Sequence, residues 1–276
     1  MTAGLVSASE DETVEREERA IADHARLPVR TVYQIVRQEG QEQMERPAVS
    51  LWWSGFAGGL SISFSLLGEA ALMRGLPQAP WTPLVASLGY SIGFLMVILA
   101  RQQLFTETTV TVVLPLLAEF SRRNLLQMGR MWSLVLAANF AGTLLASLFC
   151  SFTPVLDDGL RQAMLDVSMH TLGHGWFEML VRGISAGFLI AVLVWLMPSA
   201  EGAEFQMTVV LTWLIAIGGF QHIVAGSMEA FMLLLAGDQG VAQTVFGFIV
   251  PVLIGNVLGG TALFAVLSYA QVMKEI

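Results

Sequence analysis

A histidine and a threonine occupy matched positions in the two halves of the chain. Thr106 precedes Asn139 by 33 residues, and His222 precedes Asn256 by 34 residues. Histidine is the side chain whose unperturbed pKa lies closest to neutral pH, so His222 is suited to exchanging a proton with a small solute. The Thr106 hydroxyl donates and accepts hydrogen bonds, so it can orient an imidazole ring and fix its tautomer. These residue types predict a polar pair for proton exchange, provided that the fold brings them together.

The composition indicates that this pair lies in a membrane protein. The chain has 276 residues, of which 55% are hydrophobic and 13% are charged, and its net charge is −8. Soluble domains carry about 25% charged residues, so 14 basic and 22 acidic side chains are too few to cover a soluble surface. The acidic balance argues against nucleic-acid partners. The single cysteine, Cys150, excludes a disulfide framework and a cysteine-rich metal site.

Long apolar runs predict six membrane-spanning segments, because about 20 apolar helical residues cross a bilayer. The runs cover residues 51–73, 81–100, 131–155, 183–197, 205–236 and 240–273. After the polar stretch Arg101-Gln102-Gln103, the pattern of the second run resumes and continues to Leu117. The fifth run is interrupted near Gly218-Gly219. We therefore expect residues 49–276 to form the transmembrane channel domain, with breaks in its second and fifth helices.

Residues 1–48 are expected to form a separate acidic, cytoplasmic segment, with ten of the 22 acidic and six of the 14 basic residues. Helical spacing over residues 9–46 predicts an apolar stripe, broken at Pro28. The stripe consists of Ala20, Ile21, Leu27, Val32, Ile35 and Val36. The alternative is a solvated, partly ordered tail. Residues 157–174 also have helical periodicity and are predicted to lie along the outer membrane surface.

The distribution of basic residues predicts that both termini are cytoplasmic. In that orientation the inner side holds ten Lys or Arg residues, namely the six N-terminal arginines with Arg122, Arg123, Arg130 and Lys274. The outer side holds three, Arg74, Arg161 and Arg182.

The two halves are predicted to be an inverted repeat, covering about residues 49–156 and 176–273. The third span contains Asn-Phe-Ala-Gly-Thr at 139–143, and the sixth contains Asn-Val-Leu-Gly-Gly-Thr at 256–261. Three spans per copy is an odd number, so the copies have opposite orientations, and broken helices in such repeats form a site near the midplane. Residues 101–106 and 218–222 should then face each other across a pore. The alternative is a chance recurrence of a helix-packing motif.

Four linked motifs resemble those of the formate/nitrite transporter family. They are Tyr-Ser-Ile-Gly-Phe at 90–94, Leu-Phe-Thr-Glu-Thr at 104–108, Phe-Gln-His-Ile-Val-Ala at 220–225 and Pro-Val-Leu-Ile-Gly-Asn-Val-Leu-Gly-Gly at 251–260. Residues 100–106 and 222–227 are most similar to the family's uncharacterised YfdC-like inner-membrane branch. The resemblance implies an all-α, aquaporin-like protomer of six transmembrane helices, assembled as a homopentamer in a bacterial inner membrane. It implies no enzyme activity, cofactor or metal.

The resemblance assigns roles to particular residues. His222 and Thr106 correspond to the pore centre. The candidate gates are Leu104, Phe105, Tyr90, Phe94 and Ile215. The candidate polar residues of the pore or of the helix breaks are Asn256, Asn139, Gln221, Arg101 and Glu107. Arg101 and Glu107 are interpreted as a structural ion pair or, alternatively, as an anion-attracting vestibule.

This chain departs from the family pattern that it resembles. Gln221 replaces a glutamate, Gly226 and Gly187 each replace an asparagine, and Gln102-Gln103 replace a small residue and an acid before Leu-Phe-Thr. We expect the loss of two amides to make the pore wider or less polar, so the substrate does not follow from the resemblance.

The expected function is a channel or proton-linked transporter for small monovalent anions or their conjugate acids. Moving a small carboxylate into an apolar constriction costs about 20 kcal/mol by the idealised Born estimate. Protonating it first at neutral pH costs roughly 4 kcal/mol. A buried, neutral His222 between apolar gates fits the second route.

Two other functions remain open. One is a pore for a small neutral solute, with flux insensitive to a proton gradient. The other is a non-conducting sensor or assembly platform, which binds a cytoplasmic partner through residues 1–48. An intramembrane enzyme is disfavoured because no catalytic partner accompanies His222, and one histidine with Glu229 is too few for a metal site.

Overall fold

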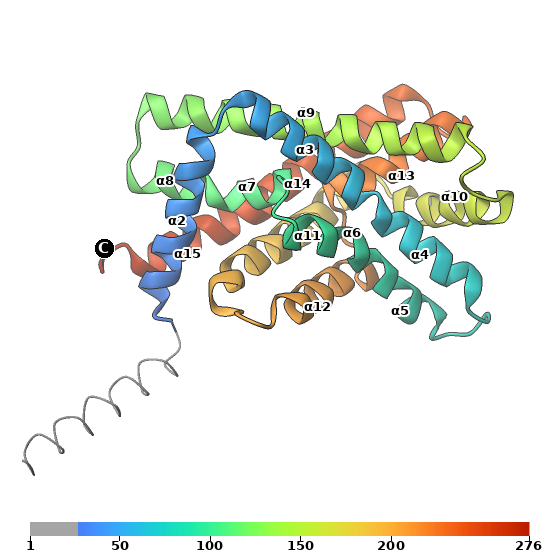
Figure 1. Ribbon diagram of the computed structural model, residues 1–276, viewed down its shortest axis with the longest axis horizontal. Coiled ribbons are helices and arrows are strands. Elements are labelled where there is room, and N and C mark those ends of the chain that lie inside the picture. Colours follow the sequence, from blue (N-terminus) through green and yellow to red (C-terminus); the bar gives the residue numbers. More distant parts are fainter. Residues whose placement is uncertain (1–26, 276) are drawn as a thin grey trace, which may run out of the picture.

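The computed structural model describes residues 27–275, and this part of the chain is helical with short connections (Figure 1). Five helical segments are long and apolar enough to cross a membrane. They are Ala48–Gly75, Thr82–Leu99, Arg122–Phe152, Trp176–Ser199 and Gln243–Val272. Three shorter apolar segments are Phe105–Ala118, Glu204–Ile217 and Ile223–Ala236. The predicted all-α membrane fold is confirmed, with breaks where the second and fifth runs were interrupted.

The long segments are built from shorter elements. The first contains α3 (Ala48–Ile62) and α4 (Phe64–Gly75), and the second contains α5 (Thr82–Ala86), η1 (Ser87–Tyr90) and α6 (Ser91–Leu99). The third is α9 (Arg122–Phe152), and the fourth is α11 (Trp176–Leu196) with η2 (Met197–Ser199). The last contains η3 (Gln243–Ile249), α14 (Val250–Val257), η4 (Leu258–Ala265) and α15 (Val266–Val272). The short segments are α7 (Phe105–Thr111) with α8 (Val113–Ala118), α12 (Glu204–Ile217) and α13 (Ile223–Ala236).

Three predicted spans differ from the observed helices. The fifth run is two separate helices, α12 and α13, so it contributes no continuous span. Helix α9 begins at Arg122 rather than at residue 131, because the Ser121 side chain caps it by accepting a hydrogen bond from the Asn124 N–H. Helix α11 begins at Trp176 rather than at residue 183, and an i,i+4 ion pair between Glu178 and Arg182 supports the added turns.

The two halves repeat the same close helix contact. Helix α3 packs on α9, and helix α11 packs on α14. A Cβ atom added at Gly59 would overlap the Asn139 carbonyl, and one added at Gly187 would overlap the Asn256 carbonyl. Small residues permit such approach of two backbones. Gly187 is therefore a packing residue between α11 and α14, and the expectation that it widens the pore is wrong.

Helix α2 (Val29–Glu45) extends the N-terminal side of the bundle. Its apolar face, with Val32, Tyr33 and Val36 buried, packs against α7, α8 and α15. The predicted stripe thus holds at Val32 and Val36, whereas Leu27 is exposed and Ile35 is partly buried. Ala20 and Ile21 lie outside the described residues.

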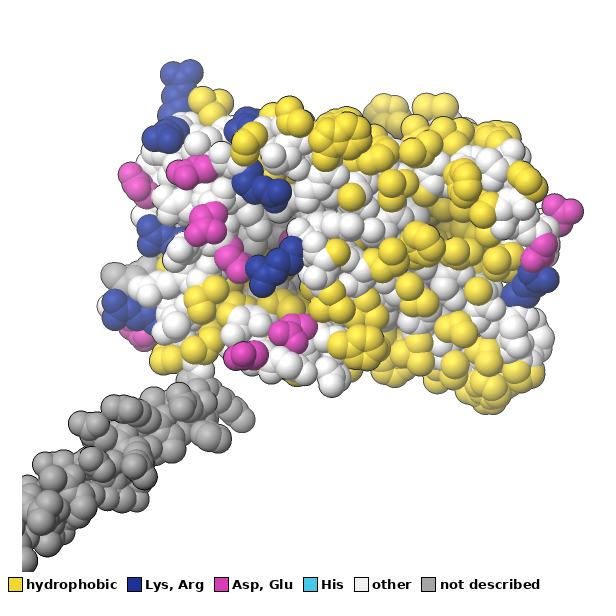
Figure 2. Space-filling view, viewed as in Figure 1, with side chains coloured by type: hydrophobic (Ala, Val, Ile, Leu, Met, Phe, Trp, Pro, Cys, Tyr) yellow, Lys and Arg dark blue, Asp and Glu magenta, His cyan; other side chains and the backbone are white. Residues whose placement is uncertain are grey.

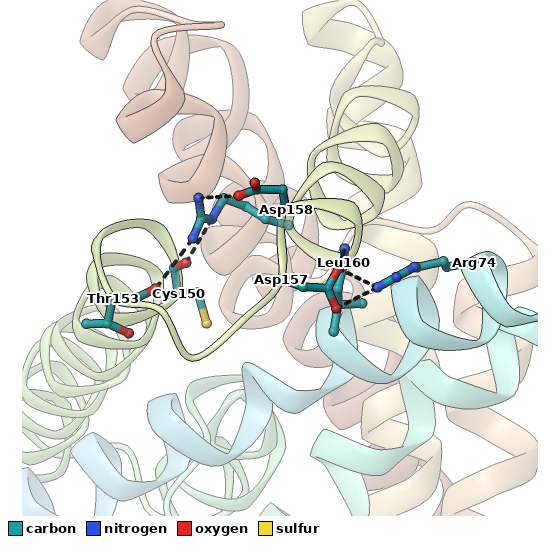
Figure 3. Close-up of polar contacts among 7 residues, drawn as sticks. Arg74, Cys150, Thr153, Asp157, Asp158 and Leu160 are labelled. Carbon is teal, nitrogen blue, oxygen red and sulfur yellow. Dashed lines mark hydrogen bonds and ion pairs between the residues drawn. The ribbon is translucent and has the colours of Figure 1, made fainter.

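Helix α10 (Asp158–Leu172) belongs to the bundle, although it was expected to lie along the membrane surface. It packs against α4 and α13 and buries Met164. Figure 3 shows the contacts that fix its start: the Arg74 guanidinium donates to both Asp157 carboxylate oxygens, at 2.7 and 2.8 Å. Arg74 holds the pKa of Asp157 below its usual value. Arg161 donates to the carbonyl oxygens of Cys150 and Thr153 at the end of α9.

Charged side chains gather at the two ends of the long axis (Figure 2). In this view they cluster at the end that carries α2 and α8 and in a smaller group at the opposite end. Apolar side chains cover most of the surface between them. Exposed residues such as Trp53, Phe149 and Leu267 belong to this apolar surface. The distribution is typical of a protein that spans a lipid bilayer.

Substituting Gly187 by alanine should lower stability, because the added methyl group meets the α14 backbone. We expect a loss of about 1–3 kcal/mol, seen as a lower Tm of the detergent-solubilised protein. The matched variant Gly129→Ala places its methyl group in open space on α9 and should leave Tm unchanged or raise it. Equal Tm values for the two variants would contradict the packing role of Gly187.

Candidate functional site at the two helix breaks

Extended backbone connects the half-helices at each break. Before α7, Arg101 has a φ of 52°, and Leu104 is extended. Before α13, Gly219 has a φ of 61°, and His222 is extended. Glycine accepts a positive φ at little cost, whereas Arg101 adopts a conformation that L-residues other than glycine, asparagine and aspartate seldom adopt.

Asn139 on α9 closes the first break. Its Oδ1 accepts a hydrogen bond of 2.9 Å from the Phe105 N–H, which is the first amide of α7. Its Nδ2 donates to the carbonyl oxygens of Gly55 and Gln103, at 2.7 and 2.9 Å. One buried amide thus pairs the Phe105 N–H and the Gln103 carbonyl, which no helix satisfies, and ties them to the Gly55 carbonyl within α3.

Asn256 on α14 closes the second break in the same way. Its Oδ1 accepts from the Ile223 N–H at 2.8 Å, and Ile223 begins α13. Its Nδ2 donates to the carbonyl oxygens of Gly183 and Gln221, both at 2.8 Å. These matching contacts pair Phe105 with Ile223. The cap position before each half-helix is therefore Leu104 in one half and His222 in the other, and Thr106 is not the counterpart of His222.

His222 and Thr106 nevertheless meet between the halves. The distance from His222 Nε2 to Thr106 Oγ1 is 2.7 Å, and both side chains are buried. His222 Nδ1 accepts a hydrogen bond of 3.1 Å from the Ala225 N–H. Because Nδ1 accepts, the proton of a neutral ring resides on Nε2 and is donated to Thr106. The backbone of α13 fixes the tautomer, and the Thr106 hydroxyl keeps its own hydrogen for another acceptor.

Two backbone amides beside this pair have no acceptor among the described residues. They belong to Thr106 and Val224, the second residues of α7 and α13. Each follows an amide that an asparagine already caps. The centre of the bundle thus offers several hydrogen-bond donors, which suits an acceptor such as an anion.

Apolar side chains surround the pair. The Phe94 ring lies edge-on to the His222 ring with centroids 5.0 Å apart, and Tyr90 lies next to Phe94 at 5.2 Å. The other candidate gates, Leu104, Phe105 and Ile215, are also buried and belong to the same apolar cluster.

A cavity of about 1260 Å³ reaches His222 from one side. We call it the vestibule. It is bounded by α4, α10, α13 and the segments around Tyr90 and Phe220. Its lining includes residues of α10, which lies at the end of the molecule opposite α2 (Figure 1). His222 belongs to the cavity lining, whereas Thr106, Leu104 and Phe105 do not and are buried.

The remaining candidates fall into two groups. Gln221 lines the vestibule, and its Nε2 donates to the Thr171 carbonyl at 2.9 Å. Arg101 is exposed, and Glu107 is half-buried with Oε1 unpaired among the described residues. These two side chains make no ion pair within 4 Å among the described residues, so the expected structural ion pair is wrong.

The structure also corrects the expectation for Gly226 and adds Phe248 to the site. A Cβ atom added at Gly226 would lie 2.6 Å from Cζ of the Phe248 ring. The Phe248 ring occupies the space next to Gly226. The replacement of asparagine by glycine at position 226 therefore does not widen the pore there. Sequence reasoning missed Phe248 because the contact joins two different helices and leaves no local pattern.

Comparison with known proteins relates nearly the whole described chain to one protein family. The family model described as formate/nitrite transporter matches residues 30–270. The "Inner membrane protein YfdC" of Escherichia coli (strain K12) is 38% identical over 269 residues, which cover 97% of this chain and 87% of that protein. The "Formate channel FocA" of Haemophilus influenzae is 26% identical and covers 78% of this chain and 84% of that protein.

Two solved structures are similar in fold. A "Pentameric formate channel with formate bound" superposes with a TM-score of 0.69 at 18% identity, covering 82% of this chain and 98% of that chain. An "FNT family ion channel" superposes with a TM-score of 0.74 at 17% identity, covering 88% and 98%. At these identities the likeness concerns the fold.

Replacing Asn256 by alanine should destabilise the protein, because it leaves the Ile223 N–H and the Gln221 carbonyl unpaired and removes the added bond to the Gly183 carbonyl of α11. We expect about 1–3 kcal/mol for each buried group that finds no water. Thermal unfolding in detergent measures the loss. Asn124→Ala, which removes one surface contact, is the matched control and should change Tm little. If Asn256→Ala unfolds at the control's temperature, Asn256 does not hold the second break.

Proposed function

Because the chain belongs to the formate/nitrite transporter family, we propose that it is a channel or proton-linked transporter for small monovalent anions or their conjugate acids. Membership of this family places it among transport proteins and not among enzymes. The observation that carries the proposal is the buried contact between His222 Nε2 and Thr106 Oγ1, at the point where two half-helices begin.

The donors at this centre suit a small anion better than a cation. The Thr106 hydroxyl and the amides of Thr106 and Val224 lie at the starts of two helices, which the contact between Thr106 and His222 joins. The positive end of the α13 dipole adds to their effect. An anion such as formate accepts such bonds, and a transferred proton lets it pass the apolar surroundings as the neutral acid.

Proton transfer through the His222 ring has a structural requirement. The neutral ring carries its proton on Nε2, and losing that proton without gaining another would leave an anionic ring. His222 must therefore take up a proton at Nδ1 before it releases one from Nε2. Uptake at Nδ1 removes the acceptor of the Ala225 N–H, so it loosens the first turn of α13. Protonation of the ring is thereby coupled to the end of the half-helix.

A small neutral solute is the second candidate, and the vestibule wall favours it. The carboxyl groups of Glu69 and Glu229 line this cavity together with His222. Ionised carboxylates there would repel an anion. A neutral-solute pore predicts flux that does not respond to a proton gradient.

We further propose an orientation and an assembly. The basic residues place both termini in the cytoplasm, so the vestibule opens to the periplasm of a bacterial inner membrane. The similarity to an inner-membrane protein supports this location. Residues 1–48 form a cytoplasmic segment, of which α2 packs on the channel domain. The likeness to a pentameric channel supports a homopentamer.

Proteoliposomes test the central pair. Wild-type protein should take up formate faster when the outside is more acidic than the inside. His222→Ala removes both the ring and the cap of α13, whereas His222→Asn keeps a cap acceptor but cannot carry a proton. Both variants should lower gradient-driven uptake by at least about tenfold.

Protein-free liposomes and vesicles without a pH gradient are the controls. Uptake by His222→Asn equal to that of the wild type would exclude proton transfer through the ring. Wild-type uptake that is equal with and without the gradient would favour the neutral-solute pore.

Native mass spectrometry tests the assembly. Each chain has a mass of 30.0 kDa, and the apolar surface between the charged ends leaves area for contacts between protomers (Figure 2). We expect the intact species released from detergent to contain five chains. A stable monomer or trimer under conditions that preserve transport would contradict the pentamer.

A further inference from the structure

Two carboxyl groups lie in the wall of the vestibule within the membrane-spanning bundle. Glu229 is on α13, seven residues after His222, and only 3% of its surface is exposed. His222 is the cap of α13, and both His222 and Glu229 line the vestibule. Glu69 is on α4 and lines the same cavity. The central donor pair and these carboxyl groups thus share one space.

Neither carboxyl group has a cationic partner within 4 Å among the described residues. The two arginines at the vestibule are paired elsewhere: Arg74 with Asp157 at 2.7 Å, and Arg182 with Glu178 at 2.8 Å. Glu69 accepts one hydrogen bond of 3.3 Å from Ser87, and Oε2 of Glu229 has no partner. The other titratable or charged groups that line the cavity are Tyr90, Asp166, His170, His174 and His222. Ionised, Glu229 would be a buried carboxylate without a cationic partner among the described residues, and Glu69 would be a half-buried one with a single hydrogen bond.

A second orphan acceptor lies on the same wall. Gln221 is 1% exposed, and its Nε2 is used by the Thr171 carbonyl, while Oε1 has no donor among the described residues. Two unpaired acceptor oxygens, those of Gln221 and Glu229, thus lie in the vestibule wall, whereas the unpaired N–H donors of Thr106 and Val224 lie beside the central pair. The vestibule wall suits groups that carry a proton, and the centre suits groups that accept one.

We propose that Glu229, resupplied through Glu69, is a proton donor that neutralises the anion in the vestibule before it reaches His222. The proposal rests on the proposed function of proton-linked anion transport, and it places the proton transfer to the anion at Glu229 and not at the His222 ring. The O–H bond of the Glu229 carboxyl breaks, and an O–H bond forms on the anion, which becomes the neutral acid. The Glu229 carboxylate then regains a proton from Glu69, and Glu69 regains one from water on the vestibule side.

This arrangement removes two difficulties. A protonated wall does not repel an incoming anion, so carboxyl groups and an anion route coexist. The anion also arrives at the pair as a neutral acid, so the Nδ1 contact with Ala225 can stay intact during passage. His222 and Thr106 then bind and orient the acid, and Glu229 brings one proton with each solute.

The test compares Glu229→Gln with the wild type in formate uptake by proteoliposomes over a range of external pH. Glutamine has the same shape but carries no acidic proton. We expect uptake under an inward proton gradient to fall at least about tenfold and to lose its rise toward acidic pH. Glu69→Gln should lower uptake by a smaller factor, because water can still reach Glu229, and Glu229→Asp should restore part of the pH dependence.

Glu201→Gln, at an exposed acidic residue outside the vestibule, is the matched control and should transport like the wild type. Unchanged Tm values verify that the variants fold. Uptake by Glu229→Gln equal to or faster than that of the wild type would overturn the proposal, because a repelling carboxylate gives an increase and a structural one gives no change.

A second readout does not depend on transport. Hydrophobic carbodiimides react with protonated carboxyl groups, and peptide mass spectrometry locates the adduct. We expect labelling of Glu229 in the reconstituted wild type at neutral pH and its loss in Glu229→Gln. Absence of labelling at Glu229, with labelling elsewhere in the bundle, would overturn the proposal. If the wild type transports no formate, formate is excluded as the substrate. The labelling then tests by itself whether Glu229 is protonated.

Discussion

The demand that buried backbone groups be paired governs this fold. Each break in a half-helix exposes amides and carbonyls at a depth where little water reaches. Asn139 and Asn256 answer this demand, each by accepting one N–H and donating to two carbonyl groups. The donated bonds also tie each break to the first helix of its own half, through Gly55 and Gly183. The glycine contacts between α3 and α9 and between α11 and α14 bring the asparagines close enough to do this. The geometry of the centre therefore depends on the close packing of these helix pairs.

The symmetric scaffold carries an asymmetric site. Both halves use the same asparagine contacts, yet the cap position holds Leu104 in one half and His222 in the other. His222 lines the vestibule, whereas Leu104 and Phe105 do not. Among the described residues, the amides of Thr106 and Val224 lack acceptors beside the pair, and Gln221 and Glu229 each have an oxygen without a donor in the vestibule wall. A solute moving inward therefore meets first a wall suited to protonated groups and then a centre suited to acceptors. This order gives the proposed route a chemical direction that the backbone symmetry alone does not contain.

Much of the architecture could be predicted from the sequence because it depends on patterns among residues that are near each other in the chain. Apolar runs locate the helices, and the recurrence around Asn139 and Asn256 identifies the repeat. The breaks at residues 101–104 and 218–222 appear as polar or glycine interruptions of apolar runs. Contacts between distant residues were less accessible. The sequence alone suggests that Gly187 lacks a pore-lining amide, but in the structure this residue packs against the backbone of α14. The sequence around Phe248 likewise gives no indication that its ring lies beside Gly226. The expected pairing of Arg101 with Glu107 failed because proximity in sequence says little about side chains on either side of a left-handed turn. The helix of residues 158–172 was foreseen, but its place between α4 and α13 depends on tertiary contacts.

The asparagine contacts that close the two breaks are made to backbone atoms, so they do not depend on the side chain at the cap position. Leucine and histidine occupy the same structural position next to the same asparagine contacts. These contacts tolerate exchange of the cap residue, whereas the added bond from the Ala225 N–H to His222 Nδ1 is particular to the second half. Gene duplication of such a unit yields two positions that are structurally equivalent and free to diverge. One position can keep an apolar residue while the other gains a titratable one. The same fold can in this way carry solutes of different acidity.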